Sequence, residues 1–238
     1  MIDKTTGQLL FLIIDPVHTL KNVYNNFQSR KIFQCPSLNV DLPNGCSADF
    51  NLVVQLYNLE ETMPLNKGHA LRQATLQPKS IEKTSVKLAV SVFCDSTRDA
   101  LVFYSEHEKK TDWLGTADFI RLITKLWHVN VKTSSKGSRK RDCTMDPVRT
   151  AWDWQLQFLK DFAYFVQRWE SSKKPGLTRE TFLALRHTCL AIAECAVYLL
   201  ETRGFDVVLL GHLQSDPIDV SVNIETDYIA QIAQVIVC

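Results

Sequence analysis

Two carboxylates three residues apart, Asp216 and Asp219, are well placed for ligand chemistry. They belong to the segment QSDPID, in which Pro217 can occupy the first position of a helix. Both side chains would then project from its opening turn. There they could bind a divalent cation or accept hydrogen bonds from the edge of a base. The alternative is a capped turn without a ligand, which is the commoner role of an Asp-Pro pair.

A second acidic group, Asp15, stands with Pro16 and His18 directly after the apolar run QLLFLII at residues 8–14. Six consecutive apolar residues predict a central strand that is covered on both sides. Strand ends in α/β sheets are where ligands and catalytic groups collect. The alternative is a plain helix start, with Asp15 near the positive end of the helix dipole.

Basic residues gather in one segment, KTSSKGSRKR at 132–141, which holds five cations and no acid. The whole chain has 27 Lys and Arg against 26 Asp and Glu, so an argument for nucleic acid must be local. The segment is predicted to be an exposed loop that contacts phosphates or serves as a nuclear import signal. A purely solvated loop is the alternative. The candidate DNA-binding residues are Lys136, Arg139, Lys140 and Arg141.

The sequence lacks the motifs of several common binding sites. The 238 residues contain no G-x-x-x-x-G-K-[ST] or G-x-G-x-x-G loop for phosphates and no Cys/His set with zinc spacing. Seven cysteines without C-x-x-C spacing indicate a reduced, intracellular chain. No unbroken apolar run exceeds six residues, and no basic-then-apolar leader opens the sequence. We therefore expect neither a membrane span nor secretion.

The elements that would position these residues are mostly helical. Apolar residues recur every three or four positions after Pro16, at Val17, Leu20, Val23, Tyr24 and Phe27. Further helices are predicted near residues 50–62, 80–106, 116–127, 150–171 and 178–204, with Thr116 and Thr178 as caps and Trp152 on an apolar stripe. The Pro- and Asn-rich stretch 32–45 predicts a loop, and 63–79 looks irregular. Residues 207–210 suit a short strand, and 220–238 form a weakly amphipathic tail.

Four segments, in order, resemble signatures of one family. FLIIDPVHTLKNVYNNF (11–27) resembles a D-P-x-H-L-L-K-x-x-x-N-N motif, and FDVVLLGHLQSDPID (205–219) resembles an L-x-x-D-P-x-E segment. PKSIEKTSVKLAVSVFCDST (78–97) and GTADFIRLITKLW (115–127) are similar to two helices of a GTP-binding insertion domain. The family is that of the P-element-like (THAP-associated) transposases of animals, and the resemblance covers roughly residues 8–219.

The resemblance implies a nuclease core with an inserted domain. In this family an RNase H-like α/β core is interrupted by a helical domain that binds GTP. We therefore expect an α+β fold that is predominantly α-helical, with remnants of the core on both sides of the insertion. The expected domains are a core strand and helix at 1–35, the insertion domain at 36–204, and a return to the core with a divergent, truncated tail at 205–238.

The resemblance also implies roles for single residues. Transposases of this family use three acidic residues that hold two divalent metals for phosphoryl transfer. We expect this chain to lack the first two, and it has Asp219 where the family has Glu. Asp219 is thus the catalytic and metal candidate, with Mg²⁺ needed only if catalysis remains. Asp216 matches a position that recognises guanine. The candidates for the GTP phosphates are Lys67, Lys83 and Lys87, with solvated lysines as the alternative.

The leading hypothesis is a transposase-derived fragment that binds GTP and cannot transpose DNA alone. One alternative is residual DNA transposase activity, in which another chain supplies the missing acids. Another is a domesticated nuclear protein that binds DNA or a partner through residues 132–141. A third is a decayed copy without a cellular role. The expected partners are a guanine nucleotide and, in the alternatives, DNA, a second copy or a full-length transposase. The expected location is the nucleus or the cytoplasm.

Overall fold

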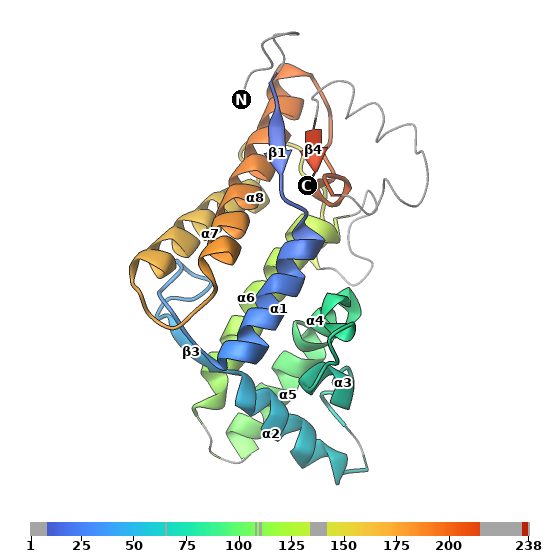
Figure 1. Cartoon of the computed structure of the whole chain (residues 1–238). Coiled ribbons are helices and arrows are strands. Elements are labelled where there is room, and N and C mark those ends of the chain that lie inside the picture. Colours follow the sequence, from blue (N-terminus) through green and yellow to red (C-terminus); the bar gives the residue numbers. More distant parts are fainter. Residues whose placement is uncertain are drawn as a thin grey trace. The chain divides into compact units, whose positions relative to one another are not determined.

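The computed structural model describes residues 9–64, 66–107, 109, 111–133 and 142–214, and the backbone of 235–237. Helices predominate in this part of the chain (Figure 1), so the α+β, mainly helical fold is confirmed. Short 3₁₀ turns are labelled η, and η3 is a π turn. The elements are β1 (Phe11–Ile13), α1 (Pro16–Arg30), β2 (Ile32–Cys35), β3 (Cys46–Asp49), α2 (Phe50–Glu61), α3 (Gln73–Leu76), η1 (Glu82–Thr84), α4 (Val86–Val92), α5 (Asp95–His107), α6 (Trp113–Val131), η2 (Cys143–Met145), α7 (Trp154–Ser171), α8 (Arg179–Val197), η3 (Tyr198–Thr202), η4 (Leu210–His212) and β4 (Val235–Val237).

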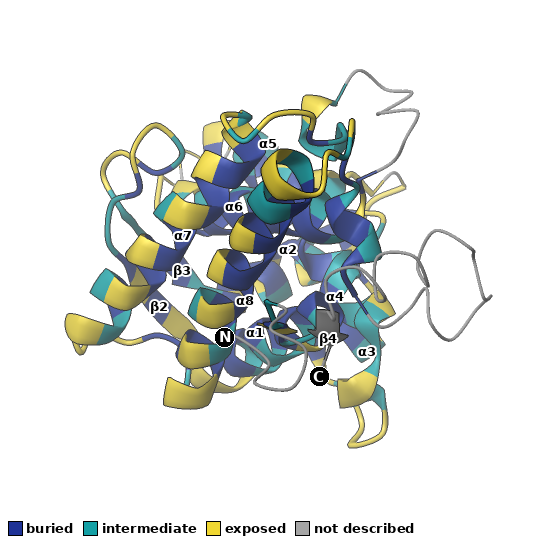
Figure 2. Cartoon of the chain, turned by 90° about the horizontal axis from the view of Figure 1, so that it is seen from above, coloured by how far each residue is buried: buried dark blue, intermediate teal, exposed yellow. Residues whose placement is uncertain are grey.

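The chain divides into two compact units, each built from separate stretches of sequence. Unit 1 comprises residues 1–19, 126–166 and 183–238, and unit 2 comprises 20–125 and 167–182. The boundaries fall inside α1, α6, α7 and α8, so each of these helices contributes residues to both units. Most of the helices are buried on one face and exposed on the other (Figure 2), as amphipathic spacing requires.

Unit 2 is organised around aromatic side chains and an antiparallel hairpin of β2 and β3. In the hairpin, residues 32–35 pair with residues 49–46. Phe27 of α1 lies with its ring centre 5.0 Å from Phe33, 5.4 Å from Phe50 and 5.1 Å from Phe119. Edge-to-face packing of such rings adds stability beyond the area that they bury. Further rings join this cluster from other elements: Phe93, Trp169 and Phe182.

Helix α6 packs closely against strand β3, where Gly115 of α6 contacts the backbone of Ser47. A Cβ built on Gly115 would overlap the carbonyl oxygen of Ser47, so only glycine fits. One residue further along α6, the hydroxyl of Thr116 accepts a hydrogen bond from the backbone N–H of Asp49 at 2.9 Å. Thr116 therefore lies inside α6 and does not cap it, because the helix already begins at Trp113. The predicted cap was wrong.

Unit 1 contains a parallel pair of strands, β1 and β4, in which residues 11–13 pair with residues 235–237. Helix α8 lies beside β1 (Figure 1): the hydroxyl of Thr188 donates to the carbonyl of Ile14 at 2.8 Å, and Nε2 of His187 lies 2.9 Å from the carbonyl oxygen of Leu12. Leu12 itself is 42% exposed, whereas Phe11 and Ile13 are buried. The strand is therefore covered on one side, and the predicted two-sided cover was wrong.

Other predicted elements also differ from the observed ones. The stretch 32–45 contains the strand β2, and the single helix predicted over 80–106 is divided into η1, α4 and α5. Trp152 precedes α7 and is 90% exposed, so it belongs to no buried stripe. The stripe after Pro16 is confirmed, since all five of its apolar residues are buried. Gly204 ends the last long helix with a φ of +71°, as predicted.

One helix in the described part of the chain, Arg179–Thr202, is long and apolar enough to cross a membrane, with a mean hydropathy of 1.5. Half of the most apolar 18-residue stretch of this helix is buried inside the protein. Its inward residues include Cys189, Ile192 and Cys195, each fully buried. The core helix of a folded domain has the same length and composition, so the finding is weak support for a membrane span.

Candidate nucleotide-binding residues

Lys67 lies on the loop between α2 and α3, with its side chain against α5. Its ammonium nitrogen is 3.9 Å from the centre of the Phe103 ring, and the ring of His107 stacks on the same phenyl group at 3.9 Å between centroids. A cation over an aromatic face is held by the quadrupole of the ring. To bind a phosphate, the ammonium would have to share or leave this contact.

The loop that carries Lys67 is fixed by a buried carboxylate. Glu60 of α2 is 2% exposed, and its Oε1 accepts hydrogen bonds from the backbone N–H of Lys67 at 2.8 Å and of Gly68 at 3.1 Å. Its Oε2 accepts a second bond from Gly68 at 2.9 Å. Burial, followed by the charge of Glu60, raises the pKa of Tyr104. Glu60 therefore sets the backbone of this loop, a role that sequence analysis missed.

Lys83 belongs to η1 and Lys87 to the start of α4. Both are exposed. The carbonyl of Lys83 accepts a hydrogen bond from Nδ2 of Asn25 on α1 at 3.1 Å. This bond ties the backbone of Lys83 to α1. Lys79, four residues earlier, is exposed as well, so three cations follow one another at four-residue intervals. Lys83 and Lys87 thus lie in two consecutive helical elements, whereas Lys67 lies on a separate loop.

The other predicted site residues lie outside the described residues. These are Asp216 and Asp219 together with the basic residues Lys136, Arg139, Lys140 and Arg141. The segment that leads to Asp216 is well anchored in unit 1: the N–H of Gly211 donates to the hydroxyl of Thr133 at 2.6 Å. Gln214 is 7% exposed, and its Oε1 has no hydrogen-bond partner within the described chain.

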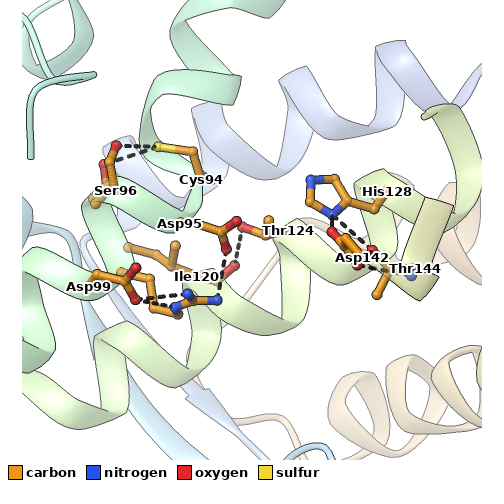
Figure 3. A network of polar contacts seen from close by, with 11 residues as sticks. Cys94, Asp95, Ser96, Asp99, Ile120, Thr124, His128, Asp142 and Thr144 are labelled. Carbon is orange, nitrogen blue, oxygen red and sulfur yellow. Dashed lines mark hydrogen bonds and ion pairs between the residues drawn. The ribbon is translucent and has the colours of Figure 1, made fainter. Parts of the chain in front are cut away.

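A small polar network stands directly after the basic segment (Figure 3). Asp142 lies 3.2 Å from Nδ1 of His128 on α6, and its other oxygen accepts from the backbone N–H of Thr144 at 2.9 Å. The hydroxyl of Thr144 donates to the same carboxylate. Burial acts to raise the pKa of Asp142, but the Thr144 hydrogen bonds and His128 outweigh it and lower that pKa. The network fixes the backbone where residues 132–141 end.

The acidic group at the end of β1 has a structural role. Oδ1 of Asp15 accepts a hydrogen bond from the backbone N–H of Val17 at 2.8 Å, as expected for a residue that caps α1. His18 is exposed on the first turn of that helix. Within the described chain, no cluster of three or more His, Cys, Asp or Glu side chains could hold a metal ion. The described residues therefore offer no metal centre in place of Asp219.

Comparison with known families decides the membership of the chain. The family described as "TNP-like, GTP-binding insertion domain" matches residues 17–141, which is more than half of the sequence. The chain belongs to this family. The matched range includes Lys67, Lys83 and Lys87 and the aromatic cluster residues Phe27 to Phe119. No curated protein matches the sequence significantly.

The fold of this TNP-like chain is similar to part of a solved transposase chain. It is similar to a chain of the Drosophila P element transposase strand transfer complex, with a TM-score of 0.71 and 18% sequence identity. The similarity covers 87% of this chain and 44% of the solved one. The predicted relation to P-element-like transposases is confirmed. The chain spans less than half of the transposase chain that it matches.

Proposed function

We propose that this TNP-like chain is a guanine-nucleotide-binding module with GTP as its ligand, and that it does not transpose DNA by itself. The observation that carries the proposal is the match to a GTP-binding insertion domain over residues 17–141. The aromatic core of unit 2 supports it, because a packed scaffold holds the lysine-bearing loops in defined positions. Defined loops lower the entropy cost of binding a ligand.

Within this proposal, Lys83 and Lys87 are the preferred partners for the GTP phosphates. Both lysines are exposed in two consecutive helical elements, whereas the ammonium of Lys67 already contacts a phenyl ring. A lysine binds phosphate as a point charge, so exposure and a fixed backbone matter more than the direction of the side chain. Asp216 is proposed for the guanine base, because a carboxylate can accept hydrogen bonds from both N1–H and the exocyclic amine.

The experiment is thermal unfolding of the purified chain with Mg²⁺ and GTP, GDP or ATP. A nucleotide at about 100 times its dissociation constant adds about 2.7 kcal/mol of stability and raises the melting temperature. We expect a rise with GTP and none with ATP. Asp216→Asn should weaken GTP binding by about tenfold or more, because one acceptor is lost and a donor takes its place.

Two further variants test the phosphate contacts. Lys83→Ala and Lys87→Ala should each weaken GTP binding by roughly tenfold, as expected for the loss of one charge-assisted contact. Lys174→Ala is the matched control, because Lys174 is also exposed but lies on the turn between α7 and α8. Equal shifts with GTP and ATP, or no shift with either, would contradict the proposal.

We also propose DNA as a partner of the basic segment. The solved transposase of similar fold was determined as a strand transfer complex. Lys136, Arg139, Lys140 and Arg141 remain the candidate phosphate contacts, and Asp219 with Mg²⁺ remains the candidate for any residual catalysis.

A further inference from the structure

Two cysteines face each other across the hairpin of unit 2. Cys35 of β2 and Cys46 of β3 are register partners. The backbone N–H of Phe50 donates to the carbonyl of Lys31 at 2.8 Å, and hydrogen-bonded pairs recur at every second position of an antiparallel ladder. Cys35 and Cys46 therefore form a hydrogen-bonded pair, whose Cα atoms lie about 5.5 Å apart. That separation is within the range that a disulfide spans.

The two thiols share one face of the hairpin and differ in access. Directly opposite residues of paired strands point to the same side. Burial, followed by the neighbouring Cys46 thiol, raises the pKa of the Cys35 thiol. Both are free thiols. Cys35 is 7% exposed, whereas Cys46 is partly exposed. Cys46 is therefore the residue of the pair that a reagent in solvent reaches first, and Cys35 is its neighbour on the same face of the hairpin.

Neighbouring backbone holds the pair in place. Gly45, the residue before Cys46, has a φ of +67°, and a Cβ at this position would lie 2.5 Å from the carbonyl oxygen of Cys35. Only glycine allows the chain to turn so close to the opposite strand. On the other side of Cys46, Ser47 is in close contact with Gly115 of α6. The strands are therefore fixed at the positions next to both thiols.

We propose that Cys35 and Cys46 form a reversible dithiol–disulfide site whose oxidant is a small-molecule disulfide of the glutathione class. The thiolate of Cys46 attacks one sulfur of the oxidised reagent, which breaks its S–S bond and releases one thiolate. The thiolate of Cys35 then attacks the sulfur of Cys46 and expels the second. Two protein thiols are oxidised, one disulfide is reduced to two thiols, and the two protein protons pass to the released thiolates.

The bond would close the loop of residues 36–45. The carboxylate of Asp41 in this loop lies 2.7 Å from the ammonium nitrogen of Lys125, and its carbonyl accepts from Arg121 at 2.8 Å. Both cations belong to α6. The guanidinium of Arg168 on α7 also donates to the carbonyl of Ser37. Oxidation would thus fix a loop that already contacts the parts of α6 and α7 that belong to unit 2.

The test is oxidation of the folded chain with excess oxidised glutathione, followed by alkylation of the remaining thiols, digestion and mass spectrometry. A Cys143→Ser background removes an exposed thiol that could cross-link two molecules. We expect a linked peptide pair joining Cys35 and Cys46, reversed by dithiothreitol. We also expect the oxidised chain to melt roughly 5 °C or more above the reduced one, since the bond constrains the unfolded state.

Two variants make the outcome decisive. In Cys35→Ala, Cys46 should keep one glutathione as a mixed disulfide, because no second thiol expels it. Cys94→Ala is the control. Cys94 is partly exposed, and its thiol contacts the hydroxyls of Ser96 (Figure 3) and Thr97, so its loss should leave the linked pair unchanged. Alkylation of both Cys35 and Cys46 in the oxidised wild type, or a stable glutathione adduct there, would overturn the proposal.

Discussion

Glu60 shows how one side chain can define a loop. Its carboxylate receives three hydrogen bonds from two adjacent backbone N–H groups while nearly all of its surface is buried. Loss of such an acceptor leaves buried donors without a partner, and each unpaired donor costs about 1–3 kcal/mol. The sequence gives little sign of this role, because Glu60 stands beside a second glutamate, Glu61, in an ordinary helical pattern.

We therefore expect Glu60→Ala to lower the free energy of unfolding by about 2–4 kcal/mol in urea denaturation. Glu61→Ala is the matched control, because Glu61 is the next residue of α2 and is exposed. Its substitution should change stability by less than about 0.5 kcal/mol. Equal effects of the two variants would show that the contact between Glu60 and the loop contributes no stability.

Asp142 predicts a pH dependence of stability. Burial raises its pKa, but hydrogen bonds from Thr144 and the charge of His128 outweigh that effect, so the pKa of the folded chain lies below the usual value. A depressed carboxyl pKa stabilises the folded state above the pKa of the unfolded state, about 3.9, and this contribution disappears as pH falls through the lower, folded value.

The measurement is urea unfolding of the wild type and Asp142→Asn from about pH 2 to pH 6. The wild type should be the more stable protein at the upper end, and the difference between the two should shrink towards the lower end. A difference that stays constant over this range would mean that the ionisation of Asp142 does not contribute to folding.

Among the elements, α6 and β3 depend on a single glycine. Any side chain at Gly115 would overlap the backbone of Ser47, and a backbone cannot move aside as a flexible side chain can. Gly115→Ala should therefore destabilise the chain by about 1–3 kcal/mol, although alanine favours helices. The control is Leu114→Ala at the neighbouring position, which is 40% exposed. Thermal unfolding of both variants decides the matter: a Gly115→Ala protein as stable as wild type would contradict the close packing.

The elements also show where sequence patterns stop being informative. Five stripe positions of α1 were predictable because each is buried at helical spacing. The break between α4 and α5 could not be predicted, because no glycine or proline marks it in the sequence. At this break Phe93 packs into the aromatic cluster. The carbonyl of Ser91, near the end of α4, accepts a hydrogen bond from the hydroxyl of Thr97 at 2.9 Å. Tertiary packing thus overrides the local pattern.

Strand β2 was missed for a related reason. Its four residues, IFQC, alternate between exposed and buried, but they stand directly before the turn-rich stretch CPSLNVDLPNG. Four residues are too few to separate a strand from a loop by pattern alone. The hairpin becomes evident only from its partner β3, and the facing of Cys35 and Cys46 follows from that pairing. The three candidate phosphate-binding lysines were predicted from the sequence, and their different surroundings are known only from the structure.

At the scale of the whole molecule, the mainly helical fold and the relation to P-element-like transposases were predictable, because several motifs occur in the family's order. The division of the chain into two compact units could not be predicted from the sequence. Helices that read as single amphipathic segments contribute to both compact units, and no change in composition marks the points inside α1, α6, α7 and α8 where the units meet in sequence. The predicted domain boundaries at residues 35 and 204 remain predictions.

The pairing of β1 with β4 sets the order in which the chain can fold. The two strands stand more than 200 residues apart in the sequence. Contacts between such distant segments form slowly, because the loop between them must close first. On the ribosome, β1 emerges long before β4 is synthesised and must wait without this partner. An unpaired apolar strand is prone to aggregate, so this interval is the time at which a nascent chain most needs a chaperone.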